Sequence, residues 1–343
     1  MQVQQDVEWP KVAIIMLNWN GWQDTIECLE SLYQITYNNY VVVIVDNDSD
    51  DESIERIKEY VIGNINIKSD CVNKPKKIIE YTREEATREG GDDDPCKRII
   101  IIKNEKNYGF AEGNNIAMRY ALRALKPDYF LLLNNDTVVE KGFLKEFVKF
   151  AESDPSIGFV GPKTYQYNFK GKSNIISFAG GKLSMWRGQA YHVGLNDIDG
   201  GQYDEIKEVD YVEGSCLFVR KELIEKIGLL NENYFAYWEE VDLIIRGQRA
   251  GYKSIYYPNA KIWHKELSSA RKINGFHEYQ TTRNMFWFMK QHATKTQLFF
   301  FIIYFFGYRF WLKSSFYIVY RRDVSRFISF YKGIVDGIKG VQR

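Results

Sequence analysis

Residues 12–21 read VAIIMLNWNG, six apolar residues followed by a polar, glycine-containing stretch. A short and uninterrupted apolar run is typical of a strand that is buried on both faces of a parallel sheet. The sequence thus predicts a buried strand over Val12–Asn18, with polar side chains placed directly at its carboxyl end.

Helical and extended patterns alternate downstream of this strand. Ser49 and Asp50 offer N-cap chemistry for the second helix. The alternation predicts an α/β fold of the Rossmann-like kind, a mostly parallel sheet flanked by helices on both faces. The expected helices cover Thr25–Tyr33, a segment up to about Tyr60 and Ala111–Leu125, and the expected strands cover Tyr40–Val45, Arg98–Ile102 and Asp128–Leu133.

The remaining segments have weaker patterns. A polar insert, residues 63–97, is expected to decorate the fold and to be part-helical over Ile78–Arg88. The later expected elements are short glycine-punctuated strands over Gly158–Val219, a helix over Glu239–Arg249, strands over Lys253–Tyr257 and Ala260–Trp263, and a helical remainder.

Charge is distributed unevenly along the 343 residues. The whole chain has a net charge of +1, which gives no reason to expect a nucleic-acid partner. Residues 265–343, however, contain 14 Lys and Arg against 4 Asp and Glu, a local balance of +10. Such asymmetry indicates that the C-terminal part meets an anionic surface.

The four cysteines lie far apart and form no CxxC pair, which argues against a structural zinc site. Cys28 and Cys216 lie in apolar patterns and are expected to be buried thiols. Cys71 and Cys96 lie in the polar insert and are expected to stay reduced, with a disulfide between them as the alternative. No signal-peptide pattern is present at the start, so we expect a cytoplasmic protein.

Four polar loops follow the four predicted strands. Ligands of doubly wound sheets bind beyond the carboxyl ends of the strands, so these loops are the candidate site. Each loop alone is ordinary turn chemistry, but four together favour a binding site. They contain Asn18 and Asn20, then Asp46 and Asn47, then Asn107, Gly109, Phe110 and Asn114, and finally Asn134, Asn135 and Asp136.

The glycine patterns exclude two common nucleotide sites. No GxGxxG follows the first strand, and no GxxxxGK[ST] occurs, which argues against a dinucleotide dehydrogenase and a P-loop NTPase. Gly109–Asn115 opens a helix and could present backbone N–H groups to an anion.

Taken in order, these motifs resemble family 2 inverting glycosyltransferases of the GT-A fold, in the rhamnosyltransferase-like branch. The resemblance covers about residues 10–265 as a catalytic domain, followed by a basic, aromatic helical tail over residues 266–343. It continues through the acceptor-side segment around Gly214 and the segment Tyr237–Leu243, and ends at His264.

The resemblance implies transfer of a sugar from a nucleoside-diphosphate sugar to an acceptor hydroxyl. Asp136 and His264 would bind Mn²⁺ or Mg²⁺, which stabilises the diphosphate leaving group. This chain has Asn134 where the family pattern has an acid. For His264 a strand-end structural role stays open.

Inversion needs a group that takes the acceptor proton, and the resemblance implies that Glu240 is this catalytic base, with Glu239 and Asp242 as nearby alternatives. Trp238, Glu239 and Asp242 are expected on the acceptor side, although acids at a helix start also complement its dipole. Asp46 is expected to accept the imide N–H of a pyrimidine, which favours a dTDP- or UDP-sugar. A strand-end cap is its alternative role.

The aromatic segment Leu298–Tyr320 has 23 residues, but Arg309 and Lys313 interrupt it. We expect a helix lying in the interface of an anionic membrane, on the inner face, close to a glycan or lipid-linked acceptor. Packing on the protein or in a homodimer, and a true span, remain alternatives. A nucleotidyltransferase and a non-catalytic nucleotide-sugar-binding protein also remain open as functions.

Overall fold

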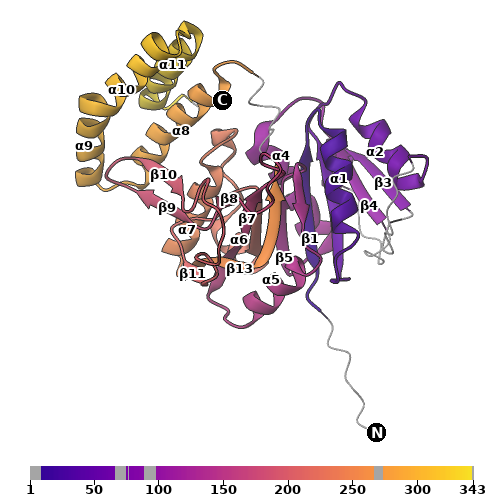
Figure 1. Ribbon diagram of the computed structural model, residues 1–343. Coiled ribbons are helices and arrows are strands. Elements are labelled where there is room, and N and C mark those ends of the chain that lie inside the picture. The colour runs from indigo at the N-terminus through magenta and orange to yellow at the C-terminus, as the bar shows by residue number, and fades with distance from the viewer. Residues whose placement is uncertain (1–8, 66–74, 76, 89–97, 266–272, 342–343) are drawn as a thin grey trace.

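The computed structural model describes residues 9–65, 75, 77–88, 98–265 and 273–341. Its centre is one large sheet whose strands run in the order β11-β13-β7-β12-β5-β1-β2-β4-β3, with β6 and β8 attached to β13 and β7 (Figure 1). The strands are β1 (Val12–Asn18), β2 (Tyr40–Asp46), β3 (Lys77–Thr82), β4 (Arg98–Lys103), β5 (Tyr129–Leu133), β6 (Thr137–Val139), β7 (Ile157–Gln166), β8 (Ile176–Phe178), β11 (Lys207–Glu208), β12 (Cys216–Arg220) and β13 (Lys253–His264). A separate hairpin joins β9 (Gly181–Ser184) to β10 (Gln189–His192).

Helices cover both faces of the sheet, as an α/β fold requires. Alternate residues of β1 show the two layers: Ala13 and Ile15 belong to one buried core cluster, while Val12, Ile14 and Met16 belong to the other. The helices are α1 (Trp22–Leu32), α2 (Ser53–Ile62), α3 (Arg83–Arg88), α4 (Gly109–Tyr120) with its π-helical extension η2 (Ala121–Leu125), α5 (Phe143–Glu152), α6 (Lys221–Ile227), the single turn η3 (Glu232–Tyr234) and α7 (Glu239–Arg249).

The sheet is mixed: its antiparallel pairs lie in the second half, although β7 and β13 pair in parallel there too. β1 through β5 pair in parallel, whereas β12 runs antiparallel to both β5 and β7. The predicted bounds of β1 and α7 are confirmed residue for residue. Cys28 and Cys216 are buried free thiols, as expected, whereas Cys71 and Cys96 lie outside the described residues.

Three local predictions are wrong. Ile78–Thr82 belongs to an edge strand rather than a helix, because it pairs in parallel with β4, and only Arg83–Arg88 is helical. The helix after β2 begins at Ser53, and Ser49 does not cap it. The Ser49 hydroxyl instead donates to Asp46 and accepts the backbone N–H of Asn20. The two strands predicted around Pro258 are one strand, β13, with a register shift between Tyr257 and Lys261.

The C-terminal part is helical, as predicted, and stacks at the far end of the molecule from α2 and β3 (Figure 1). One face of this tail is buried against α8, through Phe301, Phe305, Tyr317 and Phe330. Among the described residues, none of the helices has both the length and the apolar character needed to cross a membrane. The C-terminal part contains α8 (Phe276–His292), α9 (Lys295–Tyr304), η5 (Phe305–Arg309), α10 (Phe310–Ser315), η6 (Phe316–Tyr320) and α11 (Val324–Lys339).

Candidate active site

The first two polar loops are joined by buried hydrogen bonds at the end of β1 and β2. Asn18 and Asp46 are register partners, and Asn18 Nδ2 donates to Asp46 Oδ1 at 2.7 Å. The Ser49 hydroxyl donates to the same oxygen, and the Ser49 N–H donates to Asp46 Oδ2 at 3.0 Å. Asn20 Oδ1 accepts the Asp50 N–H, so the two loops fix one another.

Asn47 ties the third loop to the second. Its Oδ1 accepts from Asn104 and from the Tyr108 N–H, while its Nδ2 donates to Asn107 Oδ1 at 2.9 Å and to the Gly109 carbonyl. Asn104 is a contributor that the sequence did not suggest, because it directly follows β4 without a recognisable motif. Three loops that are separate in sequence thus form one polar rim.

The N-terminus of α4 does not present its first N–H groups to an anion, contrary to expectation. The Phe110 and Ala111 N–H groups donate to the Phe235 carbonyl at 2.6 and 3.1 Å, and the Gly109 N–H donates to Asn107. Gly109 has a φ of 80°, and a Cβ there would lie 2.6 Å from the Phe235 carbonyl oxygen. This close approach couples the α4 loop to the segment that precedes α7.

Asn114 lies inside this packing. It is buried and donates to the Phe110 carbonyl at 2.8 Å, which favours a role in holding the loop over direct contact with a donor. Phe110 is only partly buried, so its ring remains available at the rim.

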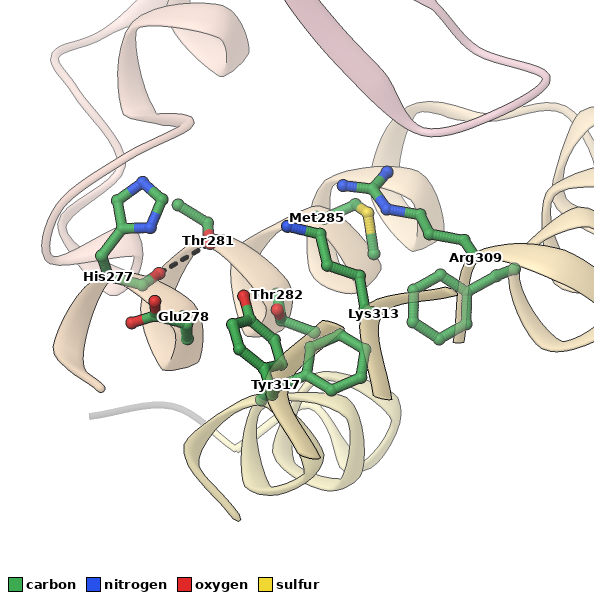
Figure 2. A pocket seen from close by; sticks show the side chains of 10 residues that line it. His277, Glu278, Thr281, Thr282, Met285, Arg309, Lys313 and Tyr317 are labelled. Atoms are coloured by element: carbon green, nitrogen blue, oxygen red, sulfur yellow. Dashed lines mark hydrogen bonds between the residues drawn. The ribbon is translucent and has the colours of Figure 1, made fainter. Parts of the chain in front are cut away.

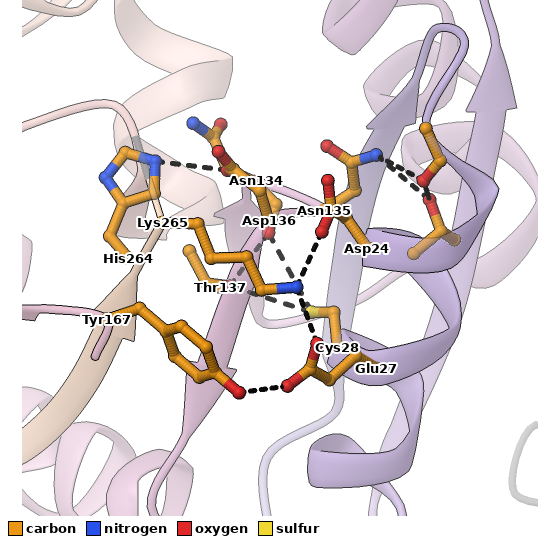
Figure 3. Close-up of polar contacts among 12 residues, drawn as sticks. Asp24, Glu27, Cys28, Asn134, Asn135, Asp136, Thr137, Tyr167, His264 and Lys265 are labelled. Atoms are coloured by element: carbon orange, nitrogen blue, oxygen red, sulfur yellow. Dashed lines mark hydrogen bonds and ion pairs between the residues drawn. The ribbon is translucent and has the colours of Figure 1, made fainter. Parts of the chain in front are cut away.

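Asp136 and His264 come together although 128 residues separate them. Strand β6 pairs with the end of β13, so that Thr137 faces His264, and the Lys265 N–H donates to the Asp136 carbonyl. The His264 Nε2 atom lies 3.1 Å from Asp136 Oδ1 (Figure 3).

These two side chains fit a divalent cation. Two ligand atoms at about 2.1 Å from a metal, in neighbouring positions of an octahedron, are about 3 Å apart. The described residues contain no group of three or more His, Cys, Asp or Glu that could hold a metal. A cation here would therefore have two protein ligands and take the others from water or a bound diphosphate, as Mg²⁺ commonly does.

Positively and negatively charged side chains lie close to Asp136 and His264. The Lys265 ammonium forms ion pairs with Asp24 at 2.6 Å and Glu27 at 2.5 Å on α1 (Figure 3). Asn135 Nδ2 donates to Thr25 and to the Gly21 carbonyl, which fastens the loop after β5 to the start of α1. Asn134 donates its backbone N–H to Ser215 at 2.9 Å, and its side chain is partly exposed beside Asp136.

Glu240 lies next to this rim. The backbone bond from Asn134 to Ser215 anchors the segment 213–215, and a Cβ on Gly214 would lie 3.8 Å from the Glu240 side chain. The absence of a side chain at Gly214 thus leaves space between Glu240 and the Phe110 ring.

The two neighbouring acids differ in how their surroundings shift their pKa values. Burial raises the pKa of Glu240 to about 6, while hydrogen bonds from the backbone oppose that rise. Burial and the adjacent Glu240 charge raise the pKa of Glu239 well above its usual value. Glu239 Oε2 is buried and has no hydrogen-bond partner among the described residues. With a pKa of about 6, Glu240 is ionised at neutral pH.

His192 and Glu213 are near Glu240 but were missed in the sequence. His192 Nδ1 lies 3.7 Å from Glu213 Oε2, and the Glu213 carboxylate contributes to the raised pKa of Glu240. No sequence motif marks His192, which lies in the β9–β10 hairpin.

The Asp242 carboxylate is buried and hydrogen-bonded to other side chains of the protein. It is 2% exposed, and its two oxygens accept from Arg246 Nε at 2.8 Å and His292 Nε2 at 2.7 Å. These bonds favour a structural role over the acceptor contact that the sequence suggested. Trp238 stacks at a tilt on Phe288 of α8, with ring centroids 4.9 Å apart, and has a φ of 78°.

The tail holds the backbone in front of Glu240. Asn284 Nδ2 donates to the carbonyls of Tyr234, Ala236 and Tyr237 at 2.9, 2.8 and 2.7 Å. The buried Arg283 donates to the Asn233 and Tyr234 carbonyls, both at 2.9 Å. The segment it holds contains three non-glycine residues with positive φ: Phe235, Tyr237 and Trp238. Such strained backbone persists where its surroundings fix it, often beside a functional site.

Comparison with known proteins agrees with this geometry. Residues 80–286 match the family described as "Glycosyltransferase like family 2", and residues 13–78 match "Glycosyl transferase family 2". The chain therefore belongs to glycosyltransferase family 2.

Curated relatives carry related names. The chain is 28% identical over 151 residues to the low-salt glycan biosynthesis hexosyltransferase Agl10 of Haloferax volcanii, covering 44% of this chain and 47% of the relative. It is 26% identical over 163 residues to the rhamnosyltransferase WbbL of Escherichia coli (44% and 58%). A 71-residue segment is 37% identical to the N-acetylglucosaminyl-diphospho-decaprenol L-rhamnosyltransferase of Mycobacterium tuberculosis (21% and 23%). Each match spans less than two thirds of the relative's length.

Solved structures support the fold assignment. A mannosyltransferase from Pyrobaculum calidifontis, in complex with GDP-Man and Mn²⁺, has a TM-score of 0.58 at 12% identity. The match covers 98% of this chain and 89% of the mannosyltransferase. GalNAc-T7 with UDP, GalNAc and Mn²⁺ has a TM-score of 0.55 at 13% identity, covering 90% and 58%. The fold is that of the GT-A glycosyltransferases, as the resemblance implied.

Proposed function

We propose that this protein is an inverting glycosyltransferase that uses a dTDP- or UDP-linked sugar and a glycan or lipid-linked acceptor. The observation that carries the proposal is the contact between Asp136 and His264 beside an ionised, partly desolvated Glu240. The names of the relatives favour a hexose or rhamnose as the sugar.

The mechanism follows from this placement. The Glu240 carboxylate takes the proton of the acceptor hydroxyl while its oxygen attacks the anomeric carbon. The bond between that carbon and the diphosphate oxygen breaks, and the nucleoside diphosphate leaves with the electron pair. A single displacement inverts the anomeric centre.

Asp136 and His264 would hold Mn²⁺ or Mg²⁺, and the cation would supply charge stabilisation for the leaving diphosphate. Asn134 and Asn135 lie in the same loop and would contact the donor. Asn134 in place of an acid leaves the cation with less negative charge, so we expect weak metal binding without nucleotide.

The rim would hold the donor nucleotide. Asp46 Oδ2 accepts the Ser49 N–H, and a carboxylate oxygen can accept a further hydrogen bond, which we assign to a pyrimidine imide N–H. Asn18, Asn20, Asn47 and Asn107 shape this pocket through the bonds described above.

We further propose that residues 10–265 form the catalytic domain and that the tail lies on the inner surface of an anionic membrane. Support comes from the +10 balance of residues 265–343 and from exposed apolar side chains on the outer face of the tail. These side chains are Phe299, Phe300, Ile303, Tyr308, Trp311, Leu312, Ile318, Val319 and Tyr320. A second copy of the chain is the competing occupant of this face.

A coupled assay for released product, run with a donor library and Mn²⁺, tests the transferase proposal. We expect nucleoside diphosphate to be released from a dTDP- or UDP-sugar, and released pyrophosphate would instead indicate a nucleotidyltransferase. Loss of release in Asp136→Asn, together with weaker Mn²⁺ binding by calorimetry, would connect the reaction to the proposed cation. Tight binding of GDP but not of UDP or dTDP would contradict the assignment of Asp46.

A further inference from the structure

A pocket lies inside the tail, away from the Asp136 and Glu240 site. It is enclosed by α8, the segment η5–α10–η6 and α11 (Figure 2). Arg309 and Lys313, one helical turn apart, point into it from one side, and residues of α8 face them (Figure 2). The lining residues are His277, Glu278, Thr281, Thr282, Met285, Phe305, Arg309, Lys313, Tyr317 and Phe330.

The Arg309 and Lys313 side chains of this pocket have no carboxylate counter-charge among the described residues. Both side chains are half-buried, and neither forms an ion pair with a carboxylate in the described part of the chain. Arg309 makes one hydrogen bond, to the Gly188 carbonyl at 3.3 Å. Burial lowers the pKa of both groups, and the Arg309 charge lowers that of Lys313 further.

The nearest carboxylate is already engaged. Glu278 forms an ion pair with Arg326 at 3.4 Å, and Arg326 also contacts Asp323 at 3.1 Å. Arg309 has the Gly188 carbonyl, and the Lys313 Nζ atom lies 5.7 Å from the centre of the Tyr317 ring, but neither cation has a carboxylate partner among the described residues. Two half-buried like charges without a counter-charge are costly to maintain, and an anion between them would relieve both desolvation and repulsion.

The position of the pocket indicates where such an anion would come from. Arg309 and Lys313 belong to the same helical segment as the exposed Tyr308, Trp311 and Leu312. A segment with aromatic and aliphatic residues on its outer face and cations beside them suits the boundary between lipid headgroups and acyl chains.

We propose that this pocket binds the phosphate group of an anionic lipid headgroup, with Arg309 and Lys313 as its cationic contacts. A guanidinium fork and an ammonium group both bind phosphate oxygens well. The inference rests on the membrane association in the proposed function, but not on catalysis.

Two double variants test the pocket in the full-length protein. Arg309→Gln with Lys313→Gln removes the pocket charges, and Arg321→Gln with Arg322→Gln removes two exposed charges nearby in sequence as the matched control. Flotation is measured with phosphatidylcholine vesicles, with and without phosphatidic acid, at constant ionic strength. Inorganic phosphate, added with EDTA, serves as the soluble probe in thermal unfolding.

We expect wild type to prefer vesicles that contain phosphatidic acid, and the pocket variant to lose on the order of ten-fold or more in affinity for them. The control variant should lose clearly less. Equal losses in both variants would mean diffuse attraction by the tail and would overturn the proposal.

Stabilisation of wild type by inorganic phosphate, with vesicle affinity unchanged in the pocket variant, would overturn the lipid assignment in favour of a free phosphate. If the double variant does not fold, Lys313→Gln alone provides the comparison. Nucleoside diphosphate release is measured separately, so failed transfer with intact vesicle binding counts against the proposed function and not against the pocket.

Discussion

Glu239 and Glu240 are adjacent in sequence, yet their environments separate their chemistry. Glu239 faces the interior and is 4% exposed, whereas Glu240 faces the space left by Gly214. Burial raises both pKa values, and that of Glu240, at about 6, lies just below neutral pH. A base with a pKa near the working pH combines a high ionised fraction with good proton affinity.

We therefore expect kcat/KM to fall about ten-fold per pH unit below pH 6, because the base must be deprotonated to accept the acceptor proton.

Glu240→Gln should lower kcat by roughly 10²- to 10⁴-fold with nucleotide binding intact. Glu239→Gln is the matched control, and it should keep the wild-type pH profile since the buried Glu239 side chain does not face the space left by Gly214.

Protein stability provides a check on these variants. The folded state raises the pKa of Glu240, so its ionisation above pH 6 opposes folding. Glu240→Gln should therefore not lower the midpoint of thermal unfolding at pH 7.5. A flat activity profile from pH 8 to pH 5, or near-normal turnover of Glu240→Gln, would remove Glu240 from the role of base.

At the scale of elements, α8 fixes the position of α7. Asn284 and Arg283 hold the segment before α7. His292, at the C-terminal end of α8, contacts Asp242 of α7 itself. Arg249 donates to His292 Nδ1 at 2.9 Å, and a guanidinium cannot accept, so His292 Nε2 carries the proton that Asp242 accepts. The helix that carries Glu240 is thus fastened to α8 at two places.

Asn284→Ala tests this positioning. It leaves three carbonyl groups without their donor, and we expect kcat to fall about ten-fold while the UDP dissociation constant changes less than about two-fold. Gln291→Ala removes an exposed amide from the same helix and serves as the control. A parallel loss of nucleotide affinity would show that Asn284 acts on the whole fold rather than on the position of Glu240.

At the scale of the whole molecule, the tail is a structural part of the catalytic unit. Phe286, Phe301 and Phe305 join the same core as α4 and α7. A protein that ends near His292 would expose this core, so truncation cannot report on membrane binding alone. Point variants on the outer face are the suitable probes.

Asp242→Asn should weaken the connection between the two parts. Removing one partner of a buried ion pair costs about 3 kcal/mol or more, measured as the free energy of unfolding in urea at pH 7. The control is Glu52→Gln, which breaks an exposed pair with Arg56 and should cost less than about 1 kcal/mol. Equal costs for the two variants would mean that Asp242 does not hold the tail.

The sequence by itself determined the central strands and the helix that carries Glu240, because the local patterns over Val12–Asn18 and Glu239–Arg249 depend on neighbouring residues alone. It also determined which side chains follow each strand. It misassigned Ile78–Thr82, since an edge strand with partly exposed residues lacks the continuous apolar pattern of an inner strand.

Only the tertiary structure decided which side chains meet. Asp136 reaches His264 through pairing of β6 with β13, Asp242 reaches His292 through packing of α7 on α8, and Arg309 and Lys313 share a pocket closed by α11. Contacts between residues so distant in the chain depend on the packing of whole layers. The pKa of Glu240 depends on that packing too, because the burial that raises it comes from segments distant in the chain.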